Sequence, residues 1–437
     1  MGKIRNVLGG GTRMVYDSLM AAQRAHARWE LETSKVILTK RRKLLMLLTI
    51  PVILVAGLEL AHAYELPHVI GGKTAYAPSF ATMQMFLVSL AIGLCAGMIT
   101  GCIGAGGGFI LTPALMSVGV KGIMSVGTDM FHIFAKAIMG TTLHRKMGNV
   151  SVALALIFVI GSITGATVGG IINRGFYEKN PALSDAFISL VYVIILGFLS
   201  IYTFSDFLRQ RKHIAAGTSA KAGDLTKLAR AAQGLKMPPY ITFDQHVVPG
   251  GRRISVYPVI LAGFIIGFIA SIMGVGGGFL FFPTFVYGLG VSTLTTVGTD
   301  LLQIIVTAGY TSVVQYAVYG FVFYTLAMGL LLGSLVGIQI GAITTKMVPA
   351  IVITGFYALT TFAGFVNRGF ALPGTLTKAG YMSMAPSTSK MLDSIGLLVF
   401  FAIVGAFALW VLASFFANAG KYRRGEIEVT SAAAHGH

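Results

Sequence analysis

Charged residues are scarce in this chain of 437 residues: Asp, Glu, Lys and Arg together make up 11% of it. Hydrophobic residues, in contrast, make up 55%. A soluble fold of this length could not bury so many apolar side chains, so lipid is expected to surround the chain. Ten-residue segments of alternating hydrophobicity are also absent, which argues against an outer-membrane barrel.

Cysteine is nearly absent as well. Its two occurrences, Cys95 and Cys102, fall in one expected helix about 10 Å apart along the axis, beyond the reach of a disulfide. The patterns H-E-x-x-H and G-x-S-x-G are missing, as are a phosphate loop followed by lysine and a Cys/His cluster. We therefore expect no enzyme activity, no metal site and no cofactor.

Acidic residues are few: 15 Asp and Glu stand against 33 Lys and Arg, which gives a formal net charge of +18. The basic residues gather in residues 1–43, in residues 205–253 and after Lys421, not in one patch that would bind nucleic acid. This is the positive-inside pattern of membrane proteins, so both termini are expected in the cytoplasm. Residues 1–43 form a basic cytoplasmic arm, either an interfacial helix or a solvated tail.

Long apolar stretches are abundant. Ten of them have close to the 20 or so residues that a helix needs to cross a membrane, and they predict an all-α polytopic membrane protein. The first ends in a sequence that resembles a signal-peptidase site, but the basic region before it is too long for an ordinary secretory signal. We expect it to be retained as an extra transmembrane helix. The ten stretches are 44–63, 83–103, 123–143, 150–172, 186–204, 256–273, 294–319, 321–345, 349–366 and 394–417.

A glycine-rich motif occurs twice within these apolar surroundings. Gly-Ala-Gly-Gly-Gly-Phe at 104–109 returns as Gly-Val-Gly-Gly-Gly-Phe at 274–279, and other glycines, a proline and a Gly-Thr-Asp element return with it in the same order. The chain therefore divides into two homologous repeats with a connector that holds a short surface helix around 222–233. The divisions are a first repeat 83–204, a basic linker 205–253, a second repeat 254–366, and a loop, last transmembrane helix and basic tail in 367–437.

The short apolar segments 109–120 and 279–291 leave the topology open. If each crosses the membrane, every repeat has five elements and the repeats are inverted; if each dips in and returns, the repeats are parallel. Placing the basic linker in the cytoplasm favours inversion. In both cases the glycine runs predict broken or re-entrant helices, and Pro113 and Pro283 predict the starts of the helices that follow.

The glycine runs are the first candidate site. Backbone at membrane depth is tolerated where it lines a cavity or is buried in protein. Consecutive glycine amides followed by a helix start suit an anion. The alternative is a tight bend that only permits close packing. The glycines expected to contact substrate are Gly104, Gly106, Gly107, Gly108, Gly274, Gly276, Gly277 and Gly278.

The Gly-Thr-Asp element places Asp129 and Asp300 in matching spans, where an ionised carboxylate costs about 2.5–3.5 kcal/mol. We expect these two residues to couple transport to a proton or sodium ion. His132 and Lys136 share a helix face with Asp129, and an internal ion pair between Asp129 and Lys136 is the alternative. The second repeat carries Gln303 and Thr307 at the matching positions. The side chains expected to contact the anion are Thr128, His132, Lys136 and Thr299.

A later helix of each repeat carries glycine at every fourth position. Such small residues let two helices approach closely in lipid, so a packing role is expected here and not a binding role. The glycines are Gly161, Gly165 and Gly169 in the first repeat and Gly333, Gly337 and Gly341 in the second.

Taken in order, these motifs resemble the TauE/SafE sulfite exporter family. The resemblance rests on the duplicated Gly-x-Gly-Gly-Gly-Phe run, the proline that follows it, the Val-Gly-Thr element and the glycine-spaced helix, all in both halves. It implies an inner-membrane carrier of sulfite, sulfate, thiosulfate or sulfonated organic anions. Both copies carry Asp where the family usually has Ser after Gly-Thr.

The expected function is secondary transport of a small sulfur-containing anion across the bacterial cytoplasmic membrane, coupled to a proton or sodium gradient. A passive anion channel and a membrane-embedded sensor or scaffold are the alternatives. The expected partners are the anionic substrate, the coupling ion and membrane lipid, with no nucleic acid; the chain could also form a homo-oligomer.

Overall fold

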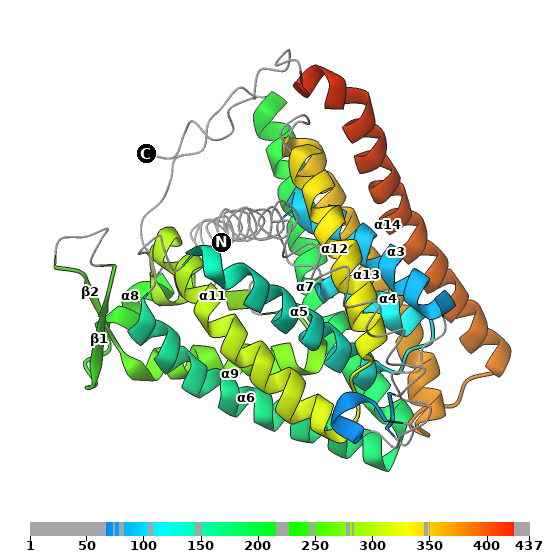
Figure 1. The fold of residues 1–437 in the computed structure, drawn as a ribbon, viewed down its shortest axis with the longest axis horizontal. Coiled ribbons are helices and arrows are strands. Elements are labelled where there is room, and N and C mark those ends of the chain that lie inside the picture. Colours follow the sequence, from blue (N-terminus) through cyan, green and yellow to red (C-terminus); the bar gives the residue numbers. More distant parts are fainter. Residues whose placement is uncertain are drawn as a thin grey trace, which may run out of the picture.

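The computed structural model shows a bundle of α-helices, and within the described part of the chain one two-stranded antiparallel sheet projects from it (Figure 1). The expected basic arm 1–43 and first helix 44–63 lie outside the described residues. The structure describes residues 67–72, 75–77, 83–103, 108–144, 151–215, 227–244, 250–276, 280–281, 284–344, 348 and 350–423.

The first half of the bundle contains a short 3-10 turn and five helices. They are η1 (His68–Ile70), α3 (Met83–Ile103), α4 (Gly108–Ser117), α5 (Gly122–His144), α6 (Val152–Lys179) and α7 (Pro181–Ala215).

The second half follows a small linker unit and contains short π and 3-10 segments as well as α-helices. The linker holds α8 (Lys227–Gly234), β1 (Tyr240–Phe243) and β2 (Arg252–Ser255). The half itself contains α9 (Val256–Met273), η2 (Thr284–Leu289), α11 (Thr293–Tyr310), η3 (Thr311–Tyr316), η4 (Ala317–Tyr319), α12 (Tyr324–Thr344), α13 (Ala350–Lys378) and α14 (Pro386–Arg423).

Six of the described helices are long and apolar enough to cross a membrane: α3, α6, α7, α9, α12 and α14. The protein is therefore a helical multi-pass membrane protein, but the expected number of about ten spans is not confirmed. The expected spans that became α5, α11 and α13 are helical, yet they carry buried polar residues such as Asp129, Asp300 and Arg368. With 10 residues, α4 rises about 15 Å and is too short to cross the bilayer alone.

Helices from the two halves exchange partners. The most extensive helix contacts join α3 to α12 and α6 to α9, so each glycine-spaced helix packs along the first helix of the other half. A Cβ placed on Gly97 would come within 2.5 Å of the Ser334 carbonyl oxygen, and Gly161 and Gly165 face the backbone of α9 in the same way. The packing role expected for the glycine-spaced helices is confirmed.

The centre of the bundle lies between these two helix pairs. Helices α5 and α11 pack against each other there, through a small apolar cluster of Met130, Ile133, Ala137, Ile304 and Ala308. Helix α7 packs on α13, and α14 covers α13, α12 and α3 along the outer edge in Figure 1. The central pair is thus enclosed by apolar helices from both halves.

The linker is more ordered than a plain connector. Helix α8 falls within the expected surface helix 222–233 apart from its last residue, and it is followed by a hairpin whose register pairs Tyr240 with Ser255 and Thr242 with Arg253. This unit contacts η2, the segment that leads into α11.

The glycine contacts yield a stability prediction. Gly97→Ala should destabilise the protein by about 1–3 kcal/mol, because the added methyl group meets the backbone of α12. Gly405→Ala in α14 is the matched control, since a Cβ there meets nothing within 4 Å; helix propensity should leave it neutral or slightly stabilised. Thermal melting of both variants in detergent checks this, and equal melting temperatures would contradict the packing role.

Candidate functional site

The two glycine segments meet in the centre of the bundle. Helix α9 ends at Gly274, whose φ of 72° is left-handed. Helix α4 begins at Gly108, where an added Cβ would lie 2.9 Å from Val275 Cα. The Tyr192 hydroxyl of α7 lies 3.2 Å from the Gly108 carbonyl oxygen and 2.5 Å from that of Met273, so it ties both broken helices together.

The described glycines of both runs are closely packed. Gly274 lies against Thr112 and Val126, and Gly276 lies against Ile133 and Ile304. Side chains therefore surround the described parts of the two segments. The remaining glycines expected to contact substrate lie outside the described residues: Gly104, Gly106, Gly107, Gly277 and Gly278.

The expected helix start at Pro113 is wrong. Helix α4 begins at Gly108, and Pro113 is its sixth residue. The N–H groups of the first turn of α4 lie directly beside the run, from Gly108 onward. Pro283 lies outside the described residues.

Asp129 of α5 is fully buried and lies beside the start of α4. Its Oδ2 accepts a hydrogen bond from the Thr112 hydroxyl at 3.2 Å and lies 3.4 Å from a Cβ placed on Gly108. Its Oδ1 pairs with His132 Nδ1 at 3.4 Å. Lys136 also acts electrostatically on this carboxylate. The alternative of an Asp129–Lys136 ion pair stays a prediction.

His132 connects this carboxylate to the other half of the chain. Its Nε2 lies 3.1 Å from the hydroxyl of Ser334, a residue of α12 that is 202 positions away. His132 and Lys136 are both buried, with 1% and 4% of their surface exposed. The first-half cluster thus contains a carboxylate, an imidazole and an ammonium group within the bundle.

Asp300 of α11 heads a matching cluster in the second half. Its Oδ1 accepts a hydrogen bond from Gln303 Nε2 at 2.6 Å, and the Thr307 hydroxyl donates to Gln303 Oε1 at 3.1 Å. Thr307 in turn lies 2.7 Å from the hydroxyl of Ser162 on α6. The structure therefore gives each aspartate its own buried chain of partners that ends on a glycine-spaced helix of the other half.

Thr128 and Thr299 also join the two halves, each through a hydrogen bond from backbone N–H to side-chain hydroxyl. The backbone N–H of Phe323, just before α12, donates to the Thr128 hydroxyl at 3.0 Å. The backbone N–H of Ser151, just before α6, donates to the Thr299 hydroxyl at 3.3 Å. Both threonines accept a hydrogen bond from a helix start of the opposite half. The hydroxyls that were expected to contact the anion are therefore also used to join the halves.

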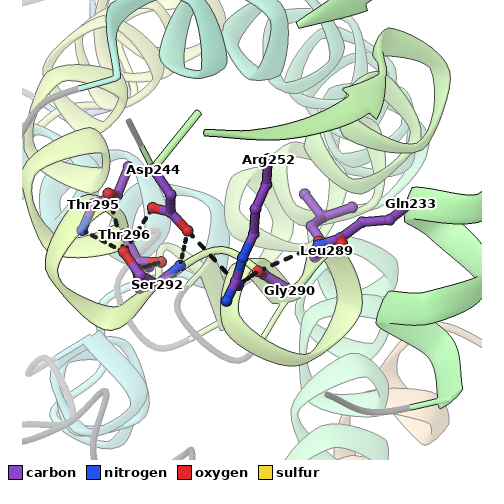
Figure 2. Close-up of polar contacts among 8 residues, drawn as sticks. All are labelled: Gln233, Asp244, Arg252, Leu289, Gly290, Ser292, Thr295 and Thr296. Atoms are coloured by element: carbon purple, nitrogen blue, oxygen red, sulfur yellow. Dashed lines mark hydrogen bonds and ion pairs between the residues drawn. The ribbon is translucent and has the colours of Figure 1, made fainter. Parts of the chain in front are cut away.

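The linker fixes the start of α11, the helix that carries Asp300 (Figure 2). The Asp244 carboxylate accepts hydrogen bonds from the Ser292 backbone N–H at 2.9 Å and from its hydroxyl at 2.6 Å. Arg252 lies 3.8 Å from the same carboxylate and donates to the Gly290 carbonyl oxygen at 2.7 Å. A negative group at a helix N-terminus is stabilised by the helix dipole.

Two buried arginines escaped the sequence reasoning. Arg174 donates to both oxygens of Gln315, at 2.6 and 2.7 Å, and Arg368 donates to Asn367 and Ser117. Neither has an ion pair with a described residue. The signal in the sequence is the tetrapeptide Asn-Arg-Gly-Phe, which occurs at 173–176 and again at 367–370.

Comparison with known proteins identifies the family of this chain. The family model described as Sulfite exporter TauE/SafE matches residues 89–367, which span both halves and the linker. The chain belongs to the TauE/SafE family. No solved structure matches this TauE/SafE chain at a significant level.

Curated relatives are similar over the same part of the TauE/SafE protein. YjnA of Bacillus subtilis, named a probable membrane transporter protein, is 25% identical over 256 residues, which are 57% of this chain and 87% of the relative. YunE of the same organism, with the same description, is 26% identical over 275 residues, 60% of this chain and 89% of the relative. A probable membrane transporter protein of Xylella fastidiosa is 24% identical over 268 residues, 60% of this chain and 85% of the relative. Family and relatives are thus transporters by name.

The threonine contacts generate a prediction. Thr128→Val should lower the unfolding free energy by about 1–3 kcal/mol, because the Phe323 N–H loses its buried acceptor. Thr128→Ser keeps the hydroxyl and should stay within about 1 kcal/mol of the parent protein. Denaturant titration in detergent measures both. A valine variant as stable as the serine variant would show that the bond contributes nothing.

The linker contacts generate another. Asp244→Ala should destabilise the start of α11 by about 1–2 kcal/mol, since it removes the acceptor of two Ser292 hydrogen bonds. Asp244→Asn keeps one acceptor oxygen, so its stability should fall between those of the parent protein and Asp244→Ala. Hydrogen exchange of residues 292–296 reads the effect locally, and unchanged exchange in Asp244→Ala would refute it.

Proposed function

We propose that this TauE/SafE protein is a secondary transporter for a small sulfur-containing anion in the bacterial cytoplasmic membrane. Sulfite, sulfate, thiosulfate and organosulfonates form the substrate class, and a proton or sodium gradient supplies the driving force. The observation that carries the proposal is the pair of buried aspartate clusters where the broken helices of two halves meet. The basic termini and linker support a cytoplasmic location for all three.

The repeat architecture belongs to this proposal. Several contacts between the halves have an equivalent counterpart: α3 with α12 matches α6 with α9, and Thr128 with Phe323 matches Thr299 with Ser151. Such reciprocal contacts support a pseudo-two-fold relation. Together with the cytoplasmic linker they favour inverted repeats, which is a common plan of secondary transporters with a central site.

The anion would bind where positive charge and backbone N–H groups converge. The start of α4 presents backbone N–H groups beside the first glycine run, and Lys136 and His132 add buried cationic groups on α5. A sulfur oxyanion needs several donors and at least one positive charge, and these elements supply both. Gly104, Gly106 and Gly107 of the first half and Gly277 and Gly278 of the second half would contribute amides.

Asp129 links this anion site to the coupling ion. Its carboxylate lies next to Gly108 at the start of α4, so it competes with a bound anion for the same positive helix end. Two negative charges at one buried position repel each other strongly. A proton or cation that neutralises Asp129 therefore favours the anion, which is the differential binding that coupling requires. Asp300 holds the equivalent place in the second half.

Flux measurements test the function. Proteoliposomes containing the protein should accumulate a radiolabelled sulfur oxyanion when a proton or sodium gradient is imposed, and cations or neutral solutes should not compete. Asp129→Asn and Asp300→Asn should each lower the gradient-driven flux at least about tenfold, equivalent to about 1.4 kcal/mol. Glu178→Gln, which changes an exposed carboxylate at the end of α6, is the control and should retain the flux.

Three other outcomes would be decisive. Flux that no gradient drives and that the double aspartate variant leaves unchanged would indicate a passive anion channel. No flux of any anion from correctly folded protein would indicate a sensor or scaffold. Flux of cations alone would reject the anion assignment.

A further inference from the structure

The two aspartate clusters match position by position but differ in chemistry. Asp129 corresponds to Asp300, and Ser334 corresponds to Ser162 as the serine from the opposite half. Between them, the first cluster has His132 and Lys136, whereas the second has Gln303 and Thr307. The fold is thus the same in both halves, but an imidazole that titrates near neutral pH is present only in the first cluster.

The surroundings of His132 fit a ring that carries two protons. Its Nδ1 faces the Asp129 carboxylate at 3.4 Å, and its Nε2 faces the Ser334 hydroxyl at 3.1 Å. The hydrogen of that hydroxyl is directed to the Leu331 carbonyl oxygen at 3.0 Å, so its oxygen is available as an acceptor. In the neutral form the hydroxyl can rotate and donate to Nε2 instead. Ser334 therefore satisfies the ring in both protonation states.

Gln303 fills the same place without this freedom. Its Nε2 donates to Asp300 at 2.6 Å, and its Oε1 accepts from Thr307 at 3.1 Å. An amide has one donor end and one acceptor end, and it takes up no proton in the physiological range. The second cluster is consequently a fixed hydrogen-bond chain, which holds Asp300 in one arrangement.

The charged groups around His132 come from several elements. Its own helix supplies Asp129 and Lys136, and the packed helix α11 supplies Asp300. The uncharged groups are Ser334 from α12, Thr112 from α4 and the Tyr192 hydroxyl from α7, the last two acting through Asp129. Protonation of His132 adds one positive charge to this cluster, which lowers the electrostatic cost of admitting an anion.

We infer that the coupling ion is a proton and that it binds at His132, held between Asp129 and Ser334, while Gln303 at the matching position takes up no proton. This deepens the proposed function and rests on it. The proton binds a ring nitrogen with the anion and leaves that nitrogen when the anion leaves. No bond of the substrate changes, and one proton moves in the same direction as each anion.

His132→Gln is the decisive variant, because it gives the first cluster the chemistry of the second. In the parent protein, flux should change up to about tenfold per pH unit within the range pH 5 to 8, the limit for one titrating proton. In His132→Gln it should vary less than about twofold over that range. Alkalinisation measured with a pH dye on the donor side should accompany anion flux only in the parent protein.

Two further variants separate a proton site from a structural role. Asp300→Asn should lower flux but keep the pH dependence, because His132 remains. Ser334→Ala removes the acceptor of Nε2–H, so its pH profile should move toward acidic pH without becoming flat. If Asp300→Asn abolishes the pH dependence, or if Ser334→Ala leaves the profile unmoved, the assignment to His132 is wrong.

Imidazole NMR of nitrogen-labelled protein makes the test independent of transport. The signal that His132→Gln removes should titrate between pH 5 and 8 and should shift when sulfite or sulfate is added. A pH-dependent flux that survives in folded His132→Gln overturns the inference but leaves anion transport intact. Absence of all anion flux in the parent protein overturns the transport function, whatever the titration shows.

Discussion

Backbone polar groups in a membrane protein must find partners inside the protein wherever a helix breaks, and this requirement shapes the centre of the bundle. Helices α3 and α9 both stop at a glycine run. The Tyr192 hydroxyl bridges carbonyl oxygens from the two breaks, and Thr128 and Thr299 accept from N–H groups at the starts of α12 and α6. The partner of each backbone group lies on a different helix, and the two threonines lie in the opposite half from the N–H groups they bond. These backbone groups are therefore satisfied only once the halves have packed together.

The same requirement brings the two aspartates into reach of both halves. Because α3 packs on α12 and α6 on α9, Ser334 and Ser162 face the polar sides of α5 and α11. A buried carboxylate without partners would be costly, and here each one receives a hydrogen bond from the residue three positions on. The side chains that give the two aspartates their partners thus also join the two halves.

Much of this plan was readable from the sequence. Glycine at every fourth position predicted close helix packing, and the structure confirms it. A glycine leaves room for a neighbouring backbone whichever helix that neighbour belongs to, so this prediction does not require the partner to be known. The count of ten spans is not confirmed, since buried polar residues in α5, α11 and α13 lower the apolar character that marks a span. The helix start at Pro113 was wrong, because α4 already begins at Gly108 and Pro113 lies inside it. The hairpin of the linker was not predicted, because its two four-residue strands are too short to show a clear alternating pattern.

The sequence by itself determined the membrane environment and the positions of Asp129 and Asp300 in helices, because composition and motifs need no knowledge of neighbours. Only the tertiary structure decided their partners. His132, one turn from Asp129, pairs with it, and Lys136, two turns away, acts electrostatically on the same carboxylate. Ser334, 202 residues further along, completes the cluster, because the other half of the chain folds back against α5.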